Sequence, residues 1–271
     1  MIKTDCHLHS SFSSDSDAAL ESMVQQGIAL GLKSMCITEH LDYDYPPNEE
    51  NLDFLLDFDA YQKELFRLKK AYAGQIELLF GIELGLQPHL NARYAEVTQT
   101  YPFDFVIGSS HLVDGIDPYE PEYFEHHGTH MGIQRYFESI IENVNACTDV
   151  DFQVYGHLDY VVRYAEGKSD SFSYEAYADL IDTMLTAIIS HGKGIELNTA
   201  GLKYGLAYPN PHMDILKRYR ELGGTILTIG SDGHKPEHMA YDFDKVPAIL
   251  KEAGFDHYTI FKDRKPVDIA I

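Results

Sequence analysis

Cysteine is scarce in this chain, and its spacing excludes two common uses of the residue. The 271 residues include only Cys6, Cys36 and Cys147, which are odd in number, widely spaced and free of any CxxC pair. A disulfide framework or a cysteine-type zinc site needs more thiols at closer spacing. Cys6 and Cys36 lie in apolar segments, where a thiol usually acts as a small hydrophobic side chain. We therefore expect a protein of the reducing cytoplasm.

Basic residues are also in deficit. Lysine and arginine number 21 against 43 aspartates and glutamates, so the formal net charge is −22. A nucleic-acid partner would require a surface rich in basic residues that neutralise phosphates. The charge does not exclude a small anionic substrate, because divalent cations in one pocket reverse the potential locally. We predict no nucleic-acid partner.

Long hydrophobic runs are missing as well. No segment approaches the roughly 20 apolar residues of a membrane-spanning helix. Residues 1–5 turn polar without the apolar stretch of a signal peptide. The composition, with 44% hydrophobic and 24% charged residues, is that of an ordinary soluble globular protein. The sequence therefore predicts no membrane partner, and it leaves the oligomeric state open.

Apolar segments of strand length alternate with amphipathic segments of helix length along the whole chain. The predicted strands are 2–7, 34–40, 76–84, 103–111, 152–158, 193–199 and 225–232. The predicted helices are 18–32, 58–72, 91–100, 133–147, 174–191, 213–222 and 236–253. This alternation is typical of a parallel sheet with helices outside it. Since α/β barrels commonly have this length, we predict one domain over residues 1–271, folded as a closed or nearly closed barrel.

Helix ends and one long connection add detail to this prediction. Asp17 is a candidate N-cap of the first helix. Glycines stand where five helices should end: Gly31, Gly74, Gly192, Gly223 and Gly254. The segment 114–131 is acidic and contains proline, so we predict a long loop on the functional face, suited to a lid or a substrate contact. We assign its histidines, His126, His127 and His130, to solvated loop, with a lid contact or a further metal site as alternatives.

Six of the seven predicted strands end in residues that bind metal ions. The histidines and carboxylates at these ends are His7, His9, His40, Glu83, His111, His157, Asp232 and His234. A barrel gathers the carboxyl ends of its strands, and with them its chemistry, at one mouth. Imidazoles and carboxylates without thiolate suit zinc, manganese or iron, and the set is too large for one ion. The sequence thus predicts a polynuclear metal centre.

The first strand carries an HxH pair. His7 and His9 are two positions apart on a strand, so both side chains leave the same face and can reach one ion. Asp5 shares that face one step deeper, where a carboxylate could hold an imidazole by its other nitrogen. An HxH pair alone also occurs by chance on surface strands, and the later strand ends favour the metal-binding interpretation.

Other acidic positions are compatible with more than one role. Glu83 ends an apolar strand, where a carboxylate is costly unless it is paired or binds a cation, and its two oxygens could bridge two ions. Asp15 follows the HxH pair in a polar loop and is either a metal ligand or a helix cap. Asp159 either orients His157 or caps the turn that follows.

Taken in order, these motifs resemble those of the polymerase-and-histidinol-phosphatase (PHP) superfamily. They are DCHLHS (5–10), TEH (38–40), GIE (81–83), SSH (109–111), GHLDY (156–160) and SDGH (231–234). The resemblance spans nearly the whole chain. It implies a distorted seven-stranded (β/α) TIM-like barrel that binds three divalent ions, with zinc, manganese or iron as candidates. The aspartate at position 15 and the length of the chain resemble the histidinol-phosphatase branch.

The resemblance also implies which residues hold each ion. The first ion would be bound by His7, His9, Glu83 and Asp232. The second would be bound by Glu83, His111 and His157, so that Glu83 bridges the two. The third would be bound by His40, His234 and Asp15.

The activity that the resemblance implies is hydrolysis of L-histidinol phosphate to L-histidinol and phosphate, a step of histidine biosynthesis. Arg163 and Lys203 would grip this small phosphomonoester, with Asn198 as a further contact. The alternative for Arg163 is a surface ion pair with Glu166. The expected catalytic residues are Glu83, Asp232 and His234, of which Asp232 or His234 would protonate the leaving group. An acidic or aromatic wall for the imidazole is available from Tyr43, Asp42, Tyr119, Glu120 and Tyr123.

Three other classes of function are weighed against this one. A general phosphomonoesterase, a nucleotide phosphodiesterase or an exonuclease could share the motifs, and the acidic charge disfavours the exonuclease. A non-catalytic metal-binding module would have lost ligands, whereas every ligand position is filled. A metal-dependent amidohydrolase would carry lysine or a carboxylate at the end of the fourth strand, where this chain has the sequence SSH at 109–111.

Overall fold

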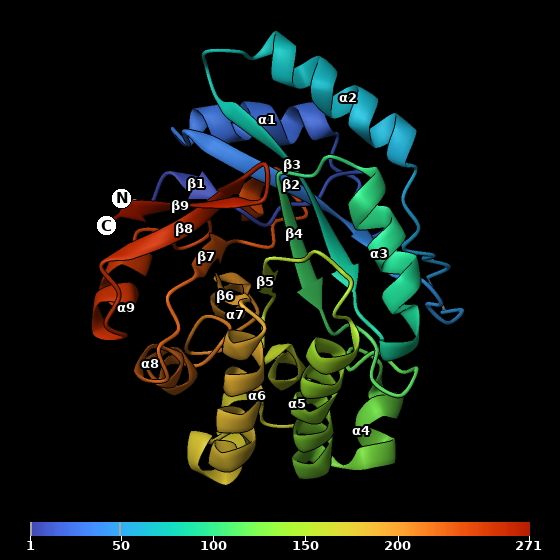
Figure 1. The fold of residues 1–271 in the computed structure, drawn as a ribbon, viewed down its shortest axis with the longest axis vertical. Coiled ribbons are helices and arrows are strands. Elements are labelled where there is room, and N and C mark those ends of the chain that lie inside the picture. Colours follow the sequence, from blue (N-terminus) through green and yellow to red (C-terminus); the bar gives the residue numbers. More distant parts are fainter. Residues whose placement is uncertain (1, 49) are drawn as a thin grey trace.

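A computed structural model of the protein, which describes residues 2–48 and 50–271, has seven parallel strands in sequence order (Figure 1). They are β1 (Thr4–Asp5), β2 (Ser34–Leu41), β3 (Glu77–Gly85), β4 (Phe105–Ser109), β5 (Val154–Tyr155), β6 (Gly194–Asn198) and β7 (Leu227–Gly230). Each strand pairs in parallel with the next. The predicted (β/α) barrel is confirmed.

The first and last strands close the barrel through the residues that follow β1. The amide of Cys6 donates to the carbonyl of Ile229 at 2.9 Å, and that of His9 donates to the carbonyl of Gly233 at 3.0 Å. Between them, the amide of Asp232 donates to the carbonyl of His7 at 2.9 Å. Pairing of β1 with β2 covers only Thr4–Asp5. Beyond β1 the chain still contacts β2, where the amide of Thr38 donates to the carbonyl of Leu8 at 2.8 Å. Residues 6–9 therefore lie between β2 and β7 and close the barrel at this seam.

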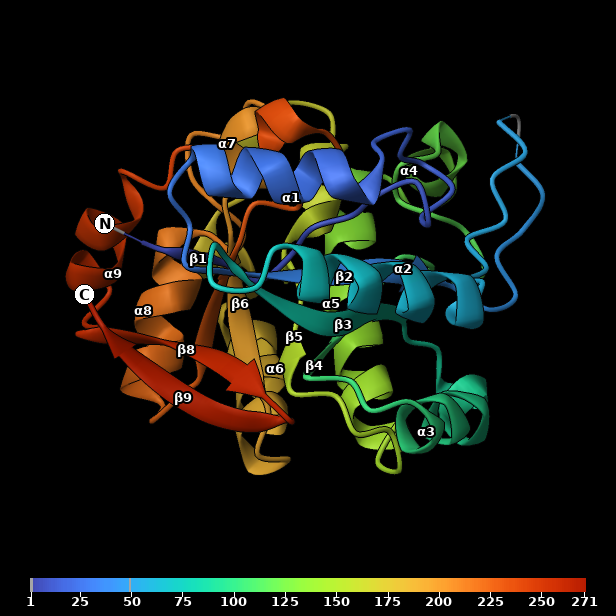
Figure 2. The ribbon, with the colours of Figure 1, turned by 90° about the horizontal axis from the view of Figure 1, so that it is seen from above.

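Helices cover the outside of the barrel (Figures 1 and 2). They are α1 (Leu20–Ala29), α2 (Phe58–Ala71), α3 (Asn91–Thr100), α4 (Pro121–His127), α5 (Thr129–Ala146), α6 (Ala178–Ser190), α7 (Ala200–Lys203), α8 (Met213–Glu221) and α9 (Val246–Glu252). Short 3-10 turns are η1 (Pro88–Leu90), η2 (Tyr160–Arg163), η3 (Lys168–Ser171), η4 (Tyr174–Tyr177) and η5 (Pro236–His238). Because helices cover their outer faces, strands such as β2 are buried along their whole length.

Single side chains join the helix layer to the sheet. The hydroxyl of Tyr61 on α2 lies 2.8 Å from the carbonyl oxygen of Ile37 on β2 and 3.0 Å from that of Gly81 on β3. At the start of α2, the carboxylate of Asp57 accepts from the amide of Ala60 at 3.0 Å, which is the usual N-cap bond. These contacts fix α2 over the strands that carry part of the site.

The predicted glycines at helix C-termini are confirmed, whereas the predicted N-cap of the first helix is not. The five glycines predicted to end helices all have positive φ, the conformation that glycine adopts without steric cost. Asp17 was predicted as the N-cap of the first helix, and this is wrong: the cap position is Ala19, and α1 begins at Leu20.

Three predicted segments need correction. The segment predicted as the loop 114–131 contains α4, with Pro121 in its first turn, and the start of α5. The predicted helix 236–253 is divided into η5 and α9, because Ala240 and Asp242 between them have positive φ and cannot continue a helix. The predicted helix 174–191 begins as η4 and becomes α-helical only at Ala178.

A C-terminal hairpin, β8 (His257–Lys262) and β9 (Lys265–Ala270), was not predicted. It lies across the end of the barrel where strands begin (Figure 2): Phe261 stacks on Phe105 at 5.3 Å between ring centres, and Lys262 pairs with Glu77 at 2.7 Å. The hairpin thus covers the amino ends of β3 and β4 and leaves the opposite mouth free for the site.

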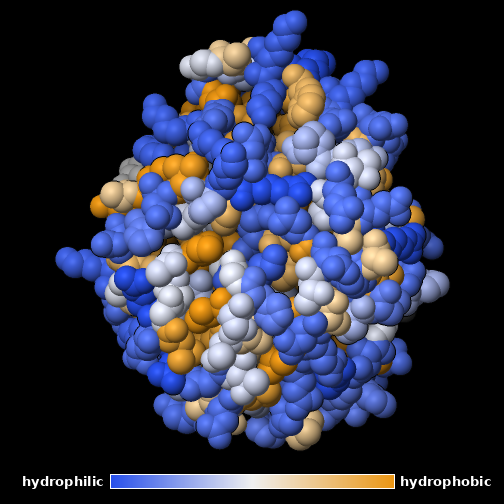
Figure 3. All heavy atoms as spheres, in the orientation of Figure 1, coloured by the Kyte–Doolittle hydropathy of each residue, from blue (hydrophilic) through white to orange (hydrophobic). Residues whose placement is uncertain are grey.

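The surface in Figure 3 is mostly hydrophilic, with small separate hydrophobic patches. Among the described residues, no helix has both the length and the apolar character that crossing a membrane requires.

Candidate metal centre

The predicted ligands gather at the mouth formed by the carboxyl ends of the strands. They come from the ends of β1, β2, β3, β4, β5 and β7, or directly after them, and from the loop before α1: His7, His9, Asp15, His40, Glu83, His111, His157, Asp232 and His234. Most of these side chains are buried, with Glu83 completely so. The structure therefore brings together residues from seven separate segments of the chain.

Glu83 on β3 is the centre of this cluster. Its Oε2 lies 3.1 Å from Nε2 of His7, 3.1 Å from Nδ1 of His40 and 3.5 Å from Nε2 of His9. Its Oε1 lies 3.0 Å from Nε2 of His157 and 3.3 Å from Nε2 of His111. Each carboxylate oxygen thus faces a different set of imidazoles, which is the arrangement of a bridging carboxylate.

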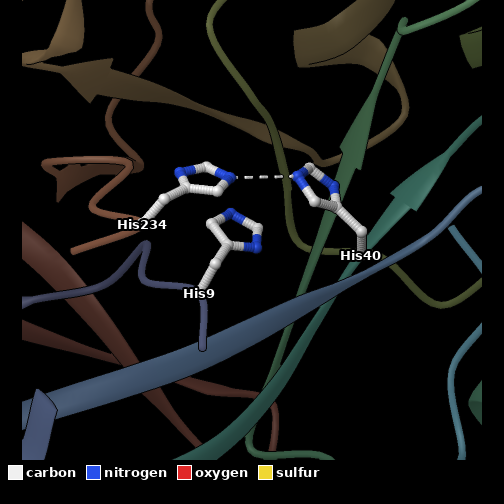
Figure 4. Close-up of side chains that lie close together, drawn as sticks. All are labelled: His9, His40 and His234. Atoms are coloured by element: carbon white, nitrogen blue, oxygen red, sulfur yellow. Dashed lines mark hydrogen bonds between the residues drawn. The ribbon is translucent and has the colours of Figure 1, made fainter. Parts of the chain in front are cut away.

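The described residues include three groups of potential ligands, and within each group the ligand atoms lie within 4.8 Å of one another. They are His7, His9 and Asp232; His40, Glu83 and His111; and His9, His40 and His234. Figure 4 shows the last group, in which Nε2 of His234 and Nε2 of His40 are 3.4 Å apart above the ring of His9. The resemblance implied a different division, since it placed His9 with the first ion alone.

Asp15 lies beside the third group. Its Oδ2 is 3.0 Å from Nε2 of His234 and 3.5 Å from Nε2 of His40. The side chain is therefore in position to share an ion with these histidines, and it does not cap α1, whose cap position is Ala19.

Unpaired buried atoms test whether the cluster suits metal ions. Among the described residues, Nε2 of His7, Nε2 of His9 and Oε2 of Glu83 are buried and have no hydrogen-bond partner, although all three face one another. Buried polar atoms are costly unless they are hydrogen-bonded or bind a cation. Imidazole nitrogens and carboxylate oxygens that converge in this way fit divalent ions of the zinc type.

The electrostatics of Glu83 support the same conclusion. Burial alone would raise the pKa of Glu83, but the charges of His7, His111 and His40 hold its pKa well below the ordinary value. His9 shows the opposite effect: burial, together with the nearby His40, His234 and His7, lowers the pKa of His9 well below the ordinary value. An ionised Glu83 and a neutral His9 are the protonation states in which these two groups bind a metal.

Further carboxylates contact the Nδ1 atoms of two of these imidazoles. Oε1 of Glu196 on β6 lies 2.6 Å from Nδ1 of His7, and Oδ1 of Asp42 lies 2.7 Å from Nδ1 of His111. Asp42 comes this close because Gly85 has no side chain: a Cβ there would lie 1.8 Å from Oδ1 of Asp42. Neither carboxylate was predicted in this role: Asp42 was predicted only as a wall residue, and Glu196, which lies within a strand, was not predicted at all.

His9 is held less directly. Its Nδ1 lies 3.2 Å from Oγ of Ser13, and that hydroxyl donates to Oε2 of Glu39 at 2.5 Å. Burial raises the pKa of Glu39 to about 7. Glu39, the middle residue of the TEH motif, thus faces the loop after β1 and fixes Ser10 and Ser13.

Two predicted orienting carboxylates have other partners. Asp5 accepts from the amide and hydroxyl of Ser231, at 3.0 and 2.6 Å, and from the amide of Ala240. Its carboxylate therefore fixes the chain after β7, and the predicted contact with an imidazole nitrogen is not made among the described residues. Asp159 accepts from the side chain of Asn210 at 2.5 Å and from the amide of His212 at 2.8 Å, so its carboxylate does not orient His157. Asp159 occupies the predicted N-cap position of η2, but its side chain makes no cap bond there.

Arg163 is buried at the floor of the mouth. Its Nε donates to Oδ1 of Asn210 at 2.8 Å, and its Nη1 lies 3.5 Å from Oδ2 of Asp232. The surface ion pair with Glu166 is therefore wrong, because Arg163 is 4% exposed and points inward. A buried guanidinium beside a metal cluster is a ready site for an anion.

The other two predicted substrate contacts lie beside Arg163. Lys203 donates from Nζ to the carbonyl of Asp232 at 3.2 Å, and burial lowers its pKa to about 8. Asn198 is fully buried: its Nδ2 donates to Glu196 at 3.1 Å, and its Oδ1 accepts from the amide of Ala200 at 2.9 Å. Asn198 is thus used within the protein, where it supports Arg163, 3.5 Å away.

A cavity of about 110 Å³ lies over the cluster, and a wider one of about 540 Å³ adjoins it on the solvent side. Both are lined by an acidic and aromatic set that includes Tyr45, Asp117, Tyr160, Tyr164 and Tyr204. This set was not predicted.

The predicted wall residues are distributed between these cavities and the core. Asp42 lines the inner cavity, while Tyr119 and Glu120 line the outer one. Tyr43 instead stacks on Tyr94, and Tyr123 is buried, where it donates to the carbonyl of Gly132.

Asp117 stands out within the cavity lining. Its Oδ2 accepts from the hydroxyl of Tyr45 at 2.9 Å, and its Oδ1 accepts from the amide of Tyr119 at 2.8 Å. Burial raises the pKa of Asp117 to about 6. A buried carboxylate held by neutral donors, with aromatic rings around it, suits a cationic group of a ligand.

The histidines of the segment 114–131 lie apart from the cluster. His126 and His127 are on α4, and Nδ1 of His130 lies 2.9 Å from the hydroxyl of Tyr177. No metal-binding group found among residues 2–48 and 50–271 includes any of the three.

A parallel barrel with buried imidazoles and carboxylates at its mouth defines a metal-binding barrel of the hydrolase type. The sequence model of the PHP domain matches residues 5–200, and the chain therefore belongs to the PHP domain family. The resemblance noted in the sequence is confirmed.

Within the family, the chain is similar to histidinol phosphatases. It is 30% identical to the histidinol-phosphatase of Lactococcus lactis subsp. lactis (strain IL1403), over 98% of this chain and 96% of the relative. A relative from Clostridium acetobutylicum is 33% identical over 88% of this chain and 89% of its own length. The crystal structure of the Lactococcus lactis histidinol phosphate phosphatase, in complex with zinc, L-histidinol and phosphate, superposes with a TM-score of 0.87 at 28% identity, covering 98% of both chains.

Proposed function

We propose that this protein hydrolyses L-histidinol phosphate to L-histidinol and phosphate. The observation that carries the proposal is the placement of a buried imidazole–carboxylate cluster, a buried arginine and a buried aspartate around one cavity. The cluster and Arg163 suit the phosphate, and Asp117 suits the cationic end of the substrate. A full-length structural neighbour that holds zinc, L-histidinol and phosphate supports the same substrate.

The metal centre would hold three divalent ions, with zinc, manganese or iron as candidates. His7, His9, Glu83 and Asp232 would hold one of them, Glu83, His111 and His157 another, and His40, His234 and Asp15 the third. Such ions supply a nucleophile at neutral pH and stabilise negative charge on phosphoryl oxygens. The unpaired atoms of His7, His9 and Glu83 support this assignment, because each is buried and faces the others.

Arg163 would bind the phosphate group. Its Nε is fixed by Asn210, so the outer edge of the guanidinium is pre-oriented toward the cavity that it lines. Lys203 would add positive charge from the side of Asp232. Pre-positioned charges of this kind stabilise the transition state of phosphoryl transfer without reorganisation during the reaction.

Asp117 would bind the organic part of the substrate. L-Histidinol carries an amino group and an imidazole, and either one as a cation would form a charge-assisted hydrogen bond with the Asp117 carboxylate. Tyr45, Tyr160 and Tyr164 would enclose this group in an aromatic wall, which favours cations over neutral groups.

Asp232 and His234 were both predicted to protonate the leaving alkoxide. A carboxylate that binds a metal is deprotonated, so the proton would come from His234. Both line the inner cavity, and Nδ1 of His234 lies 3.2 Å from the carbonyl of Asp232. Asp232 has a φ of 51°, which is unusual for a residue other than glycine and common at functional sites. Glu83 would keep the cluster assembled throughout the reaction.

The wider context follows from the same proposal. Residues 1–271 would form one domain, because the buried hydrophobic side chains make one continuous cluster from Ile2 to Phe261. Cys6, Cys36 and Cys147 are free and buried, which suits a reducing cytoplasm. There the reaction would serve histidine biosynthesis.

Phosphate release tests the proposed function. Metal-replete protein is assayed with L-histidinol phosphate, p-nitrophenyl phosphate and a dinucleotide phosphodiester, and the Glu83→Gln variant reports any contaminating phosphatase. We expect kcat/KM for L-histidinol phosphate to exceed that of both comparators by at least about 100-fold, the discrimination available from a charged contact. Equal rates for the two monoesters would make the protein a general phosphomonoesterase, and preference for the diester would make it a phosphodiesterase.

A further inference from the structure

Glu196 lies on β6, the one strand at whose end the sequence shows no metal ligand. The side chain is 1% exposed and occupied at both oxygens. Oε1 lies 2.6 Å from Nδ1 of His7. Oε2 accepts from the backbone amide of His157 at 3.0 Å and from Nδ2 of Asn198 at 3.1 Å. One carboxylate thus joins β6 to the residues that follow β1 and β5.

The contact with His7 determines where the imidazole carries its proton. An ionised carboxylate only accepts hydrogen bonds, so Nδ1 of His7 must be the protonated nitrogen. In the neutral, metal-binding form of the ring, Nε2 then keeps its lone pair. This Nε2 is buried, is without a hydrogen-bond partner among the described residues, and lies 3.1 Å from Oε2 of Glu83 and 3.9 Å from Oδ1 of Asp232. The lone pair is therefore aimed at the place where carboxylate oxygens converge.

Gly230, at the end of β7, provides a second observation. A Cβ at this position would lie 2.3 Å from Oε1 of Glu196 and 2.4 Å from Cβ of His7. Distances this short are not tolerated, and neither atom is the free end of a flexible surface side chain. The absence of a side chain at residue 230 is thus what allows Glu196 and His7 to meet.

We propose that Glu196 is a positioning residue that fixes the metal-binding tautomer of His7 and ties this ligand to the backbone of His157. The proposal rests on the metal-dependent function proposed above. Glu196 touches neither substrate nor metal, and it acts through His7. Carboxylates behind metal-bound histidines typically contribute 10- to 100-fold in metal affinity.

The variant Glu196→Gln tests the proposal because glutamine keeps the size and shape of glutamate. If the amide oxygen faces His7, the amide NH₂ meets the N–H of His157, donor against donor. If the amide turns over, its NH₂ donates to Nδ1 of His7 and moves the ring proton to Nε2. Both orientations weaken the site at His7. Asp159→Asn is the matched control, since Asp159 is an equally buried carboxylate that contacts Asn210 and His212 and no ligand side chain.

Zinc binding is measured by competition with a chromophoric chelator, and the histidine tautomers are read from ¹⁵N chemical shifts in labelled, zinc-loaded protein. We expect Glu196→Gln to bind the zinc ion held by His7 about 10- to 100-fold less tightly. We also expect the variant to lose the Nδ1–H signal of His7. Asp159→Asn should retain the affinity and the signal of the unchanged protein. Affinity and tautomer signal in Glu196→Gln equal to those of the unchanged protein would overturn the proposal.

Gly230→Ala is a second variant that alters no charged residue. Its methyl group should separate Glu196 from His7 and weaken zinc binding in the same direction, which also covers the case in which Glu196→Gln folds poorly. Unchanged zinc binding in folded Gly230→Ala would contradict the role of Glu196. These readouts are independent of the substrate: a protein that releases no phosphate from L-histidinol phosphate, yet shows these zinc effects, would refute the proposed function alone.

Discussion

At the scale of single residues, Glu83 is the carboxylate around which the histidines of the cluster gather. Its two oxygens face five imidazoles, from His7, His9, His40, His111 and His157. Removing one partner of a buried charged network leaves the others uncompensated. We therefore expect Glu83→Gln to reduce both bound metal and phosphate release, the latter by more than about 100-fold, since even residues behind the ligands contribute up to that factor. Metal analysis and a phosphate assay check this.

A matched control lies on the same strand. Glu77 begins β3 at the opposite end of the barrel and pairs with Lys262 at the surface. Glu77→Gln should leave metal content and activity unchanged, because exposed ion pairs contribute at most about 1 kcal/mol. An equal loss of activity in both variants would mean that Glu83 acts through the stability of β3 alone.

Asp117 allows a prediction about specificity. Asp117→Asn keeps the size of the side chain and removes the charge that would bind the cationic end of the substrate. Above neutral pH, where Asp117 with its pKa of about 6 is ionised, we expect KM for L-histidinol phosphate to rise about 10- to 100-fold, the value of a charge-assisted hydrogen bond. Steady-state kinetics with p-nitrophenyl phosphate should show little change. A similar rise in KM for both substrates would place the cation elsewhere.

The residues at the strand ends could be predicted from the sequence, whereas the carboxylates that contact them could not. A histidine or glutamate after an apolar strand is conspicuous, because burial there is costly without a partner. Glu196 and Asp42 act by contacting His7 and His111. These roles depend on which strands are neighbours in the barrel, and local sequence does not show that. Asp5 was assigned to an imidazole for the same reason, whereas the seam with β7 places Ser231 beside it.

At the scale of helices and strands, the alternation of apolar and amphipathic segments predicted the barrel, since parallel strands covered on both faces are strongly apolar. The C-terminal hairpin escaped prediction because its two-residue turn, Asp263 and Arg264, has positive φ at both positions without the glycine or asparagine that usually marks such turns. The division of the predicted helix 236–253 was hidden in the same way, by positive φ at Ala240 and Asp242.

The hairpin supports a stability prediction. Phe261 is 4% exposed and stacks on Phe105, which ties β8 to the barrel. Phe261→Ala should lower the free energy of unfolding by about 3–5 kcal/mol. The melting temperature should then fall by roughly 5–15 °C for a chain of this size. Because the hairpin covers the end of the barrel opposite the site, KM should be unchanged at 25 °C.

Thermal unfolding and steady-state kinetics check this prediction, with Val267→Ala as the control. Val267 lies on the outer strand β9 and is 39% exposed, so its loss should change stability by no more than about 0.5 kcal/mol. If Phe261→Ala altered KM while leaving the melting temperature unchanged, the hairpin would have a role at the site and none in stability.

At the scale of the whole molecule, the proposed metal centre should also be a stabilising element. Its ligands come from six strands and one loop, so bound ions would cross-link most of the barrel. Ions present at 100 to 1,000 times their dissociation constant stabilise a folded protein by about 3–4 kcal/mol per site. We expect removal of metal with a chelator to lower the melting temperature by at least about 5 °C and to abolish phosphate release.

Restoration provides the control for this experiment. Added zinc should return both the melting temperature and the activity, while calcium, which prefers oxygen ligands, should return neither. Glu83→Gln should respond only weakly to the chelator. If metal removal abolished activity without any change in melting temperature, the ions would be held by fewer elements than the geometry indicates.

The seam between β1 and β7 has a consequence for how the protein matures during its synthesis. Asp5 and Ser231 are in contact although they lie 226 positions apart, and the ligands His7 and Asp232 stand beside them. A ribosome therefore releases His7 and His9 long before it releases Asp232 and His234. Seven of the nine proposed ligands precede β7 in the chain, so until β7 emerges the nascent chain lacks only the two ligands that follow this strand. We therefore expect an ion that depends on Asp232 or His234 to bind only after β7 has joined the barrel, later than an ion held by His40, Glu83 and His111.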